Sequence, residues 1–197
     1  MKGSPESPRS LTHARRPSLL KVAVAALALL SAVGVWAAGP YVEGLTWEYR
    51  GRDLVASFGV GDALDRPDLK ELIQSTQPVN LFFTVEVVKH RTLWKDKLVV
   101  RHVVVHTVRF DNLTRQYSLE TQVDDKVTDQ RAVGSWAEMA SYMKEVKDLT
   151  VTSVANLEPS EGGYSIRVRV HVLTNFVLWI FPWDVQTPWV SQTLETP

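Results

Sequence analysis

Two long runs of β-branched and aromatic residues constrain the fold of this chain more than any other feature. Residues 79–93 read VNLFFTVEVVKHRTL and residues 98–110 read LVVRHVVVHTVRF, with a polar turn at residues 94–97 between them. Such residues favour extended strands, so the two runs predict an antiparallel hairpin. Residues 103–105 are all valine, which indicates that both faces of this strand are covered. We therefore expect two packed layers rather than a single sheet with one face exposed to solvent.

Shorter segments extend this hairpin into a mainly β domain with two helices. Ser135 and Glu138 have the spacing of a capping box, and apolar residues then recur at helical intervals. The polar stretch at residues 124–134 is predicted to be a loop. The fold class is therefore a β-sandwich or an antiparallel sheet covered by the helices. Further strands are predicted at residues 46–50, 54–60, 115–123, 149–157 and 164–173, helices at residues 62–77 and 135–147, and a turn at residues 111–114.

A basic leader at residues 1–21 precedes an uncharged apolar segment at residues 22–38, which we predict to be one hydrophobic helix. Its length as a helix is about 26 Å, close to the roughly 30 Å of a bilayer core. Because the positive charge precedes it, the leader is expected in the cytoplasm and residues 41–197 in the bacterial periplasm, as one exported domain. Val35 and Ala37 also fit a cleavage site. A single-pass inner-membrane anchor and a cleaved signal peptide both remain open.

The composition excludes several classes of function. The chain has no cysteine, so disulfides, iron–sulfur clusters and cysteine nucleophiles are ruled out. After the five basic residues and the one acidic residue of positions 1–38 are removed, 17 basic and 21 acidic residues remain, a net charge of −4. No basic stripe indicates a nucleic-acid partner. None of the common catalytic motifs is present, and we expect a non-enzymatic protein without a cofactor.

Three histidines form the most specific candidate metal site. His102 and His106 lie four positions apart on one predicted strand and therefore point to the same face. With a two-residue turn His90 opposes Arg101 and faces the other side, whereas with a three-residue turn His90 pairs with His102 and Glu86 with His106. The second register would gather three imidazoles and a carboxylate, a plausible zinc or copper shell. The alternative is that these are ordinary strand histidines.

Tryptophans mark two candidate binding surfaces. Arg91, Trp94 and Asp96 lie at the predicted hairpin tip, where they either clamp the turn by an Arg–Asp pair under the indole or form a recognition loop. The tail WIFPWDVQTPW carries Trp183 and Trp189. These indoles either fill the core or form an interfacial belt or a partner-binding edge.

The second predicted helix offers a candidate pocket for an apolar ligand. Trp136, Met139 and Met143 recur on one face of this helix. The simpler interpretation is that they are core residues. The alternative is that they line a pocket between sheet and helix, since methionine adapts to irregular apolar ligands.

The motifs taken together resemble a known family. Residues 91–96 look like an R-x-x-W-x-D hairpin tip, residues 111–117 look like a D-x-L-T-x-x-Y turn, and Tyr164 is followed by Arg167 and Arg169. This order is similar to the bacterial domain-of-unknown-function 4390 family over roughly residues 45–189, although the usual serine before the last tryptophan is here Pro188. The resemblance implies an exported β-rich domain behind a membrane or signal segment. It assigns no activity, and it implies a sensor kinase as a partner in envelope signalling.

These observations predict a non-enzymatic module, tethered to the inner membrane through residues 22–38, that faces the periplasm and binds an envelope protein. A periplasmic carrier of an apolar ligand is the first alternative. A metal-binding protein that uses the three histidines is the second alternative.

Overall fold

The structure is a computed structural model that describes residues 40–64, 67–158, 162–173 and 184–195. These residues belong to one compact unit, which begins at Ala38. The predicted leader, the predicted hydrophobic helix and Trp183 lie outside the described residues. Within the ranges described, no helix is both long enough and apolar enough to cross a membrane.

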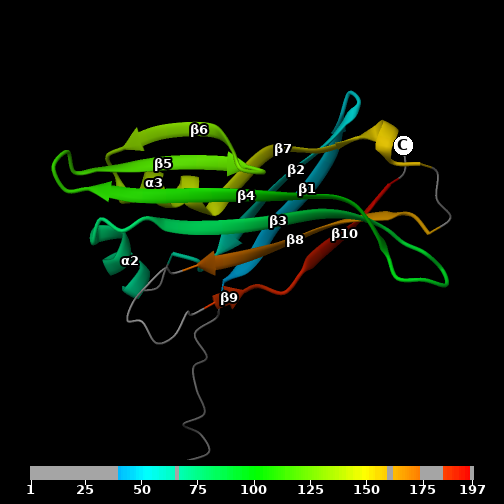
Figure 1. The fold of residues 1–197 in the computed structure, drawn as a ribbon, viewed down its shortest axis with the longest axis horizontal. Helices are drawn as coiled ribbons and strands as arrows, with labels where there is room; N and C mark the ends of the chain where they lie inside the picture. Colours follow the sequence, from blue (N-terminus) through cyan, green and yellow to red (C-terminus); the bar gives the residue numbers. More distant parts are fainter. Residues whose placement is uncertain (1–39, 65–66, 159–161, 174–183, 196–197) are drawn as a thin grey trace, which may run out of the picture. The chain divides into compact units, whose positions relative to one another are not determined.

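Two antiparallel sheets and two α-helices make up the described part of the chain, which confirms the prediction of a mainly β domain with two helices (Figure 1). A three-stranded sheet has the order β1-β2-β7, with β1 (Tyr41–Arg50), β2 (Asp53–Gly61) and β7 (Glu145–Ser153). A seven-stranded sheet has the order β10-β8-β3-β4-β5-β6, and β9 also pairs with β8. Its strands are β3 (Val79–Lys89), β4 (Lys97–Asp111), β5 (Gln116–Val123), β6 (Lys126–Val133), β8 (Tyr164–Leu173), β9 (Asp184–Gln186) and β10 (Val190–Leu194).

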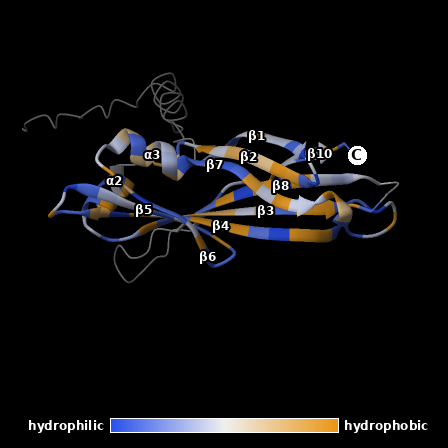
Figure 2. Cartoon of the chain, turned by 90° about the horizontal axis from the view of Figure 1, so that it is seen from above, coloured by the Kyte–Doolittle hydropathy of each residue, from blue (hydrophilic) through white to orange (hydrophobic). Residues whose placement is uncertain are grey.

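One hydrophobic core joins the two sheets and the helices α2 (Pro67–Gln74) and α3 (Trp136–Lys144). Hydrophobic and hydrophilic residues alternate along β8 (Figure 2), as expected for a sheet with one buried face. On β4 Val104 is buried but Val103 and Val105 are only half-buried, so the prediction that both faces of this strand are covered is wrong. Phe58 of β2 and Phe83 of β3 meet across the layers with ring centroids 5.8 Å apart. Burial of a large apolar side chain contributes about 1.5–3 kcal/mol, so each such contact stabilises the packing of the two sheets.

The predicted loop at residues 124–134 is wrong, because most of it forms strand β6. β6 is the edge of the seven-stranded sheet and is largely exposed. A strand without a buried face shows no alternation of apolar and polar residues in its sequence. β6 is therefore recognised only from its backbone pairing with β5 in the structure. Asp124 and Asp125 make the tight turn, with φ of 49° and 65°. A two-residue turn with two positive φ values matches the twist of a hairpin.

Other predicted elements are confirmed with shifted boundaries. Ser135 Oγ accepts from the Glu138 N–H at 3.2 Å, so Ser135 caps α3 as predicted. The Glu138 carboxylate accepts from the Ser135 hydroxyl at 2.9 Å. However, α3 ends at Lys144 and β7 begins at once. The predicted turn at residues 111–114 is closed by Asp111 Oδ1, which accepts from the Leu113 N–H at 2.8 Å. A 3-10 turn at Val154–Asn156 replaces the end of the predicted strand at residues 149–157.

The β3–β4 hairpin adopts neither of the two predicted registers. Val85 pairs with His102 and Glu86 pairs with Arg101, and a register shift follows Val87. The ladder ends at Lys89, so the loop is residues 90–96 rather than two or three residues. Pairing over the whole length of both strands fixes this register, because a slip by one residue would turn every buried valine outward.

Candidate functional site

The structure does not bring the three predicted metal-binding histidines together. His102 and His106 lie on β4 and face the segment that contains α3 and β7. His102 Nε2 is 2.7 Å from the carbonyl oxygen of Val151, and His102 Nδ1 is 2.6 Å from Asp124 Oδ2. His90 lies beyond the end of β3 and has other partners. The described ranges contain no group of three or more His, Cys, Asp or Glu side chains placed to hold a metal ion.

His106 is buried, with 3% of its surface exposed. Its ring lies 5.0 Å from that of Phe83. Burial lowers the pKa of His106 to about 4, against a smaller opposing effect of its hydrogen bonds to backbone carbonyls. The ring is therefore neutral at pH 7. Because a carbonyl oxygen only accepts, His106 Nδ1 carries the proton and donates to the Met143 carbonyl oxygen at 3.2 Å.

His90 and Asp96 close the base of the β3–β4 loop. His90 Nδ1 is 3.1 Å from Asp96 Oδ2, and His90 Nε2 is 2.9 Å from Ser165 Oγ on β8. The His90 backbone N–H also donates to the carbonyl oxygen of Gly163 at 3.0 Å. In the neutral ring Nδ1 donates to the carboxylate and Nε2 accepts from the hydroxyl. The predicted Arg91–Asp96 clamp is thus replaced by a pairing of Asp96 with His90.

This carboxylate–imidazole–hydroxyl order is the one found in serine hydrolases. A nucleophile must be open to its substrate, however, and Ser165 is only 4% exposed. Ser165 is also paired through its backbone on both sides, with Val88 of β3 and Thr193 of β10. We therefore interpret the three groups as the device that fixes the loop. Sequence patterns could not have found Ser165, because it is 75 positions from His90.

The tip of the same loop is exposed and apolar. Leu93 has 88% of its surface exposed and Trp94 has 78%. Arg91 is exposed beside them. The predicted recognition residues of the tip are therefore at the surface, on a loop whose base is held by hydrogen bonds.

A buried carboxylate lies on the opposite face of the seven-stranded sheet from the core. The Glu86 side chain is 1% exposed and lies on β3 between Arg101 of β4 and Arg167 of β8. Arg101 Nε donates to Glu86 Oε1 at 2.6 Å, and Arg167 Nε donates to Glu86 Oε2 at 2.7 Å. Burial favours the neutral acid, but the two guanidinium groups outweigh it and lower the pKa of Glu86. Such a buried charge is tolerated only because both oxygens are paired.

Trp189 extends this arrangement to the edge of the sheet. The guanidinium carbons of Arg167 and Arg169 each lie 4.7 Å from the centroid of the Trp189 ring. Arg167 and Arg169 are two positions apart on β8 and therefore point to the same face. We name the set Arg101, Glu86, Arg167, Arg169 and Trp189 the Arg–Trp cluster. Of the predicted binding tryptophans, Trp189 is thus placed among cations, away from the hydrophobic core.

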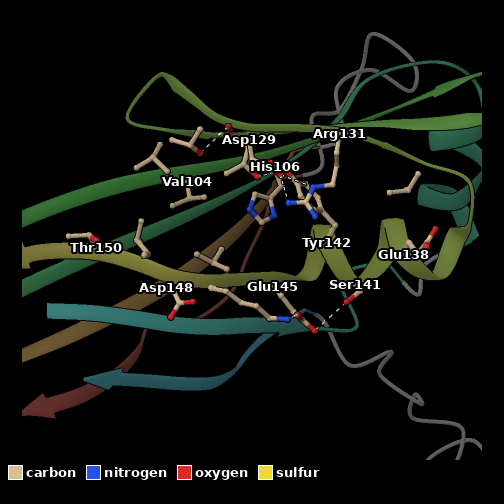
Figure 3. Close-up of a pocket in the computed structure, with 17 residues that line it drawn as sticks. Val104, His106, Asp129, Arg131, Glu138, Ser141, Tyr142, Glu145, Asp148 and Thr150 are labelled. Atoms are coloured by element: carbon tan, nitrogen blue, oxygen red, sulfur yellow. Dashed lines mark hydrogen bonds and ion pairs between the residues drawn. The ribbon is translucent and has the colours of Figure 1, made fainter. Parts of the chain in front are cut away.

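An open groove of about 830 Å³ lies between the β5–β6 hairpin and the α3–β7 segment (Figure 3). Its floor includes Val104 and His106 of β4 and Thr121 of β5. It opens between two sheet edges, because β6 ends the seven-stranded sheet and β7 ends the three-stranded sheet.

Polar groups converge on one wall of the groove. The Tyr142 hydroxyl oxygen is 2.6 Å from Thr121 Oγ1, and the Arg131 guanidinium lies 4.9 Å from the Tyr142 ring centroid. Arg131 Nε donates to Asp129 Oδ2 at 2.9 Å. Burial, with the nearby Asp129 charge, raises the pKa of Tyr142. Burial alone would raise the pKa of Asp129, but hydrogen bonds from Arg131 and Tyr142 lower it.

The predicted pocket residues of α3 do not line this groove. Met139 and Met143 are completely buried in the core. Trp136 packs against Tyr117 with ring centroids 6.2 Å apart. A cavity between sheet and helix is present, as the carrier hypothesis requires, but a different face of the helix borders it. The α3 residues that reach the groove are Glu138, Ser141 and Tyr142, which share a face at i, i+3 and i+4.

Comparison with known proteins identifies one family. The model of a family described as "Domain of unknown function (DUF4390)" matches residues 37–192. This range contains the hairpin-tip and turn motifs, and the match confirms the resemblance seen in the sequence. No curated protein and no solved structure matches the chain.

Proposed function

The chain belongs to the DUF4390 family, whose description assigns no activity, and we propose that it is a binding module that residues 22–38 tether to the bacterial inner membrane. In this proposal the module faces the periplasm and docks an envelope protein through the tip of the β3–β4 loop. The observation that carries the proposal is the exposure of two adjacent apolar side chains, Leu93 at 88% and Trp94 at 78%.

A fixed loop base supports this role. The hydrogen bonds of His90 to Asp96, Ser165 and Gly163 hold both ends of the loop. A loop that is ordered before binding loses less conformational entropy when a partner docks, and this increases affinity. Gly162 belongs to the same support, since a Cβ there would lie 2.4 Å from the His90 carbonyl oxygen.

The chemistry of the tip indicates the kind of partner. Burying a leucine or an aromatic side chain at an interface contributes about 1.5–3 kcal/mol each. Tryptophan and arginine are the residues most often found at binding hot spots. The complementary surface is an apolar depression for Trp94 with a polar rim for Arg91. A sensor kinase of the envelope is the candidate partner that the family resemblance suggests.

The test is affinity capture of the full chain from membranes, with Trp94→Ala and Leu93→Ala compared with wild type. Leu113→Ala is the matched control, because Leu113 is 95% exposed at a different turn. We expect the recovered amount of one partner protein to fall at least about tenfold with both tip variants and to be unchanged with the control. A tenfold loss of affinity is equivalent to roughly 1.4 kcal/mol. Equal recovery with wild type and tip variants would rule out this surface.

The groove favours a second candidate function, that of a ligand carrier. Its volume of about 830 Å³ is within the range of roughly 300–1,000 Å³ that is typical of small-molecule sites. Native mass spectrometry of the protein purified from membranes should then reveal a bound small molecule. Tyr142→Ala should reduce its occupancy, whereas an unliganded mass for the wild type would contradict carriage.

A further inference from the structure

We propose that the Arg–Trp cluster is a docking site for the headgroups of anionic phospholipids, which holds the module against the membrane that carries it. The inference rests on the proposed tether at residues 22–38 and goes beyond it, because a tether alone leaves the orientation of the module undefined. It assigns one face to the membrane and leaves the loop tip at residues 90–96 for the protein partner.

The length of the linker limits how far the module can be from the bilayer. The apolar segment ends at Ala38 and β1 begins at Tyr41. Three residues span at most about 10 Å. The proposed tether therefore requires the start of β1 to lie within about 10 Å of the bilayer.

Trp189 lies at the level where β1 begins. Gln192 Nε2 of β10 donates to the Leu45 carbonyl oxygen of β1 at 2.7 Å. Further along both strands, the Tyr49 hydroxyl donates to the Glu195 carbonyl oxygen at 2.8 Å. The two strands therefore run in the same direction along neighbouring edges of the two sheets (Figure 1). Trp189 is three residues before Gln192, and Leu45 is four residues after Tyr41, so Trp189 lies near the start of β1 and hence close to the proposed membrane end of the module.

The charges of the cluster fit a phosphate surface. Arg101 and Arg167 share one carboxylate, Glu86, whereas Arg169 donates to the neutral amide oxygen of Gln186 at 3.4 Å, so two positive charges are in excess within the cluster. The side chains of Arg101 and Arg167 are 56% and 34% exposed, so solvent-side ligands can reach them. Each guanidinium has five N–H donors, and the contacts with Glu86 use only the Nε and Nη2 groups. The remaining donors can bind phosphate oxygens in the planar geometry that arginine favours.

Trp189 adds the apolar component of an interfacial site. Indole rings concentrate at the headgroup level of membranes, where the apolar part of the ring contacts lipid and the N–H can hydrogen-bond to water or headgroups. Arg167 and Arg169 hold this ring by cation–π contacts at 4.7 Å. Glu86 in turn fixes Arg167, so the site is arranged before any lipid binds. An acidic protein segment is the competing occupant, and the test below distinguishes it.

The absence of cysteine in the chain allows a label to be placed at a single position. Ser191→Cys puts it on β10 opposite Arg167, and Ser118→Cys puts it on β5 opposite Arg109. Both positions are exposed, but Ser118 is distant from the cluster. The full chain, labelled with a fluorophore, is reconstituted in nanodiscs of phosphatidylcholine with or without phosphatidylglycerol. Lipids with a nitroxide on the headgroup then quench any label that lies at the membrane surface.

We expect anionic lipid to increase quenching at the Ser191→Cys position and to leave the Ser118→Cys position unchanged. Each arginine near an anionic surface favours the docked state by roughly fivefold. In the chain labelled at Ser191→Cys, Arg169→Gln should therefore reduce the increase in quenching caused by anionic lipid several-fold. Trp189→Ala should reduce this increase to a similar extent. High salt should also reduce it, because exposed charges are screened.

The readouts separate this inference from the proposed tether. Failure of the chain to co-elute with nanodiscs would contradict the tether. Co-elution with equal quenching in the two lipid compositions would overturn the headgroup site and leave the tether intact. The headgroup site would also be overturned if the Ser191→Cys label became shielded only after a membrane protein extract was added. The cluster would then bind a protein segment.

Discussion

His106 of β4 donates a hydrogen bond of 3.2 Å to the carbonyl oxygen of Met143 at the end of α3. This bond ties the seven-stranded sheet to the segment in which α3 passes directly into β7. His102, four positions earlier, contacts the Val151 carbonyl oxygen of β7 in the same way at 2.7 Å. The two histidines that the sequence offered as metal ligands therefore join the two layers of the fold.

The first prediction concerns the acid sensitivity that His106 introduces. Its pKa is about 4 in the folded protein and about 6.5 in an unfolded chain. The unfolded state therefore binds the proton first, so stability is full above pH 6.5 and falls as the pH drops towards 4. The maximal loss is about 3 kcal/mol. Urea unfolding of the detergent-solubilised chain between pH 4 and pH 7 measures it.

His106→Gln should flatten this pH dependence even if it lowers stability at pH 7. Leu113→Ala is the control, because this side chain is not ionisable and is 95% exposed, so the slope between pH 4 and pH 6.5 should be unchanged. An unchanged slope in His106→Gln would show that another group carries the acid sensitivity.

The second prediction concerns the buried carboxylate. Glu86→Gln removes the charge that Arg101 and Arg167 share and leaves two cations without their partner. Loss of one partner from a fully buried pair costs 3–5 kcal/mol, and partial exposure of the arginines reduces this to about 2 kcal/mol. Chemical denaturation measures the change. Glu71→Gln, at an exposed position of α2, should change stability by less than about 0.5 kcal/mol; equal effects would contradict a special role for Glu86.

The third prediction concerns the glycine beside the loop. A Cβ at Gly162 would lie 2.4 Å from the His90 carbonyl oxygen, which is a backbone atom and has little freedom to move. Gly162→Ala should therefore destabilise the domain by about 1–3 kcal/mol and lower its melting temperature. At Gly134 an added Cβ has no atom within 4 Å, so Gly134→Ala should be neutral within about 1 kcal/mol. If Gly162→Ala left the stability unchanged, the backbone at residue 162 would have to move away from the His90 carbonyl oxygen without cost.

The fourth prediction concerns the hydrogen bonds at the loop base. Ser165→Ala removes the hydroxyl that hydrogen-bonds to His90 Nε2 and should cost about 1 kcal/mol. Its main effect should be local, namely faster hydrogen exchange in residues 90–96. Ser191→Ala is the control, because the Ser191 hydroxyl makes only a long contact of 3.4 Å to Ile166. Unchanged exchange in Ser165→Ala would show that the loop is held by the His90–Asp96 pair and the backbone alone.

The candidate sites illustrate how far sequence patterns reach. Trp94 was predicted to be at a hairpin tip, and it is exposed there. The partner of Asp96 was not predicted, because the loop is longer than a tight turn and brings His90 rather than Arg91 to it. Tyr142 lacked any signal, since a tyrosine on the exposed side of a helix looks like surface until the β5–β6 hairpin closes over it.

The sequence by itself determined the features that depend on a few neighbouring residues. β-branched runs specified the long strands, Ser135 with Glu138 specified the start of α3, and Asp111 specified a turn. Backbone preference and capping act over one to four residues, so they can be read locally. The tertiary structure decided what depends on register. Glu86 meets Arg101 and Arg167, 15 and 81 positions away, only because packing of the whole core selects one pairing, and a slip of one residue would reverse every face.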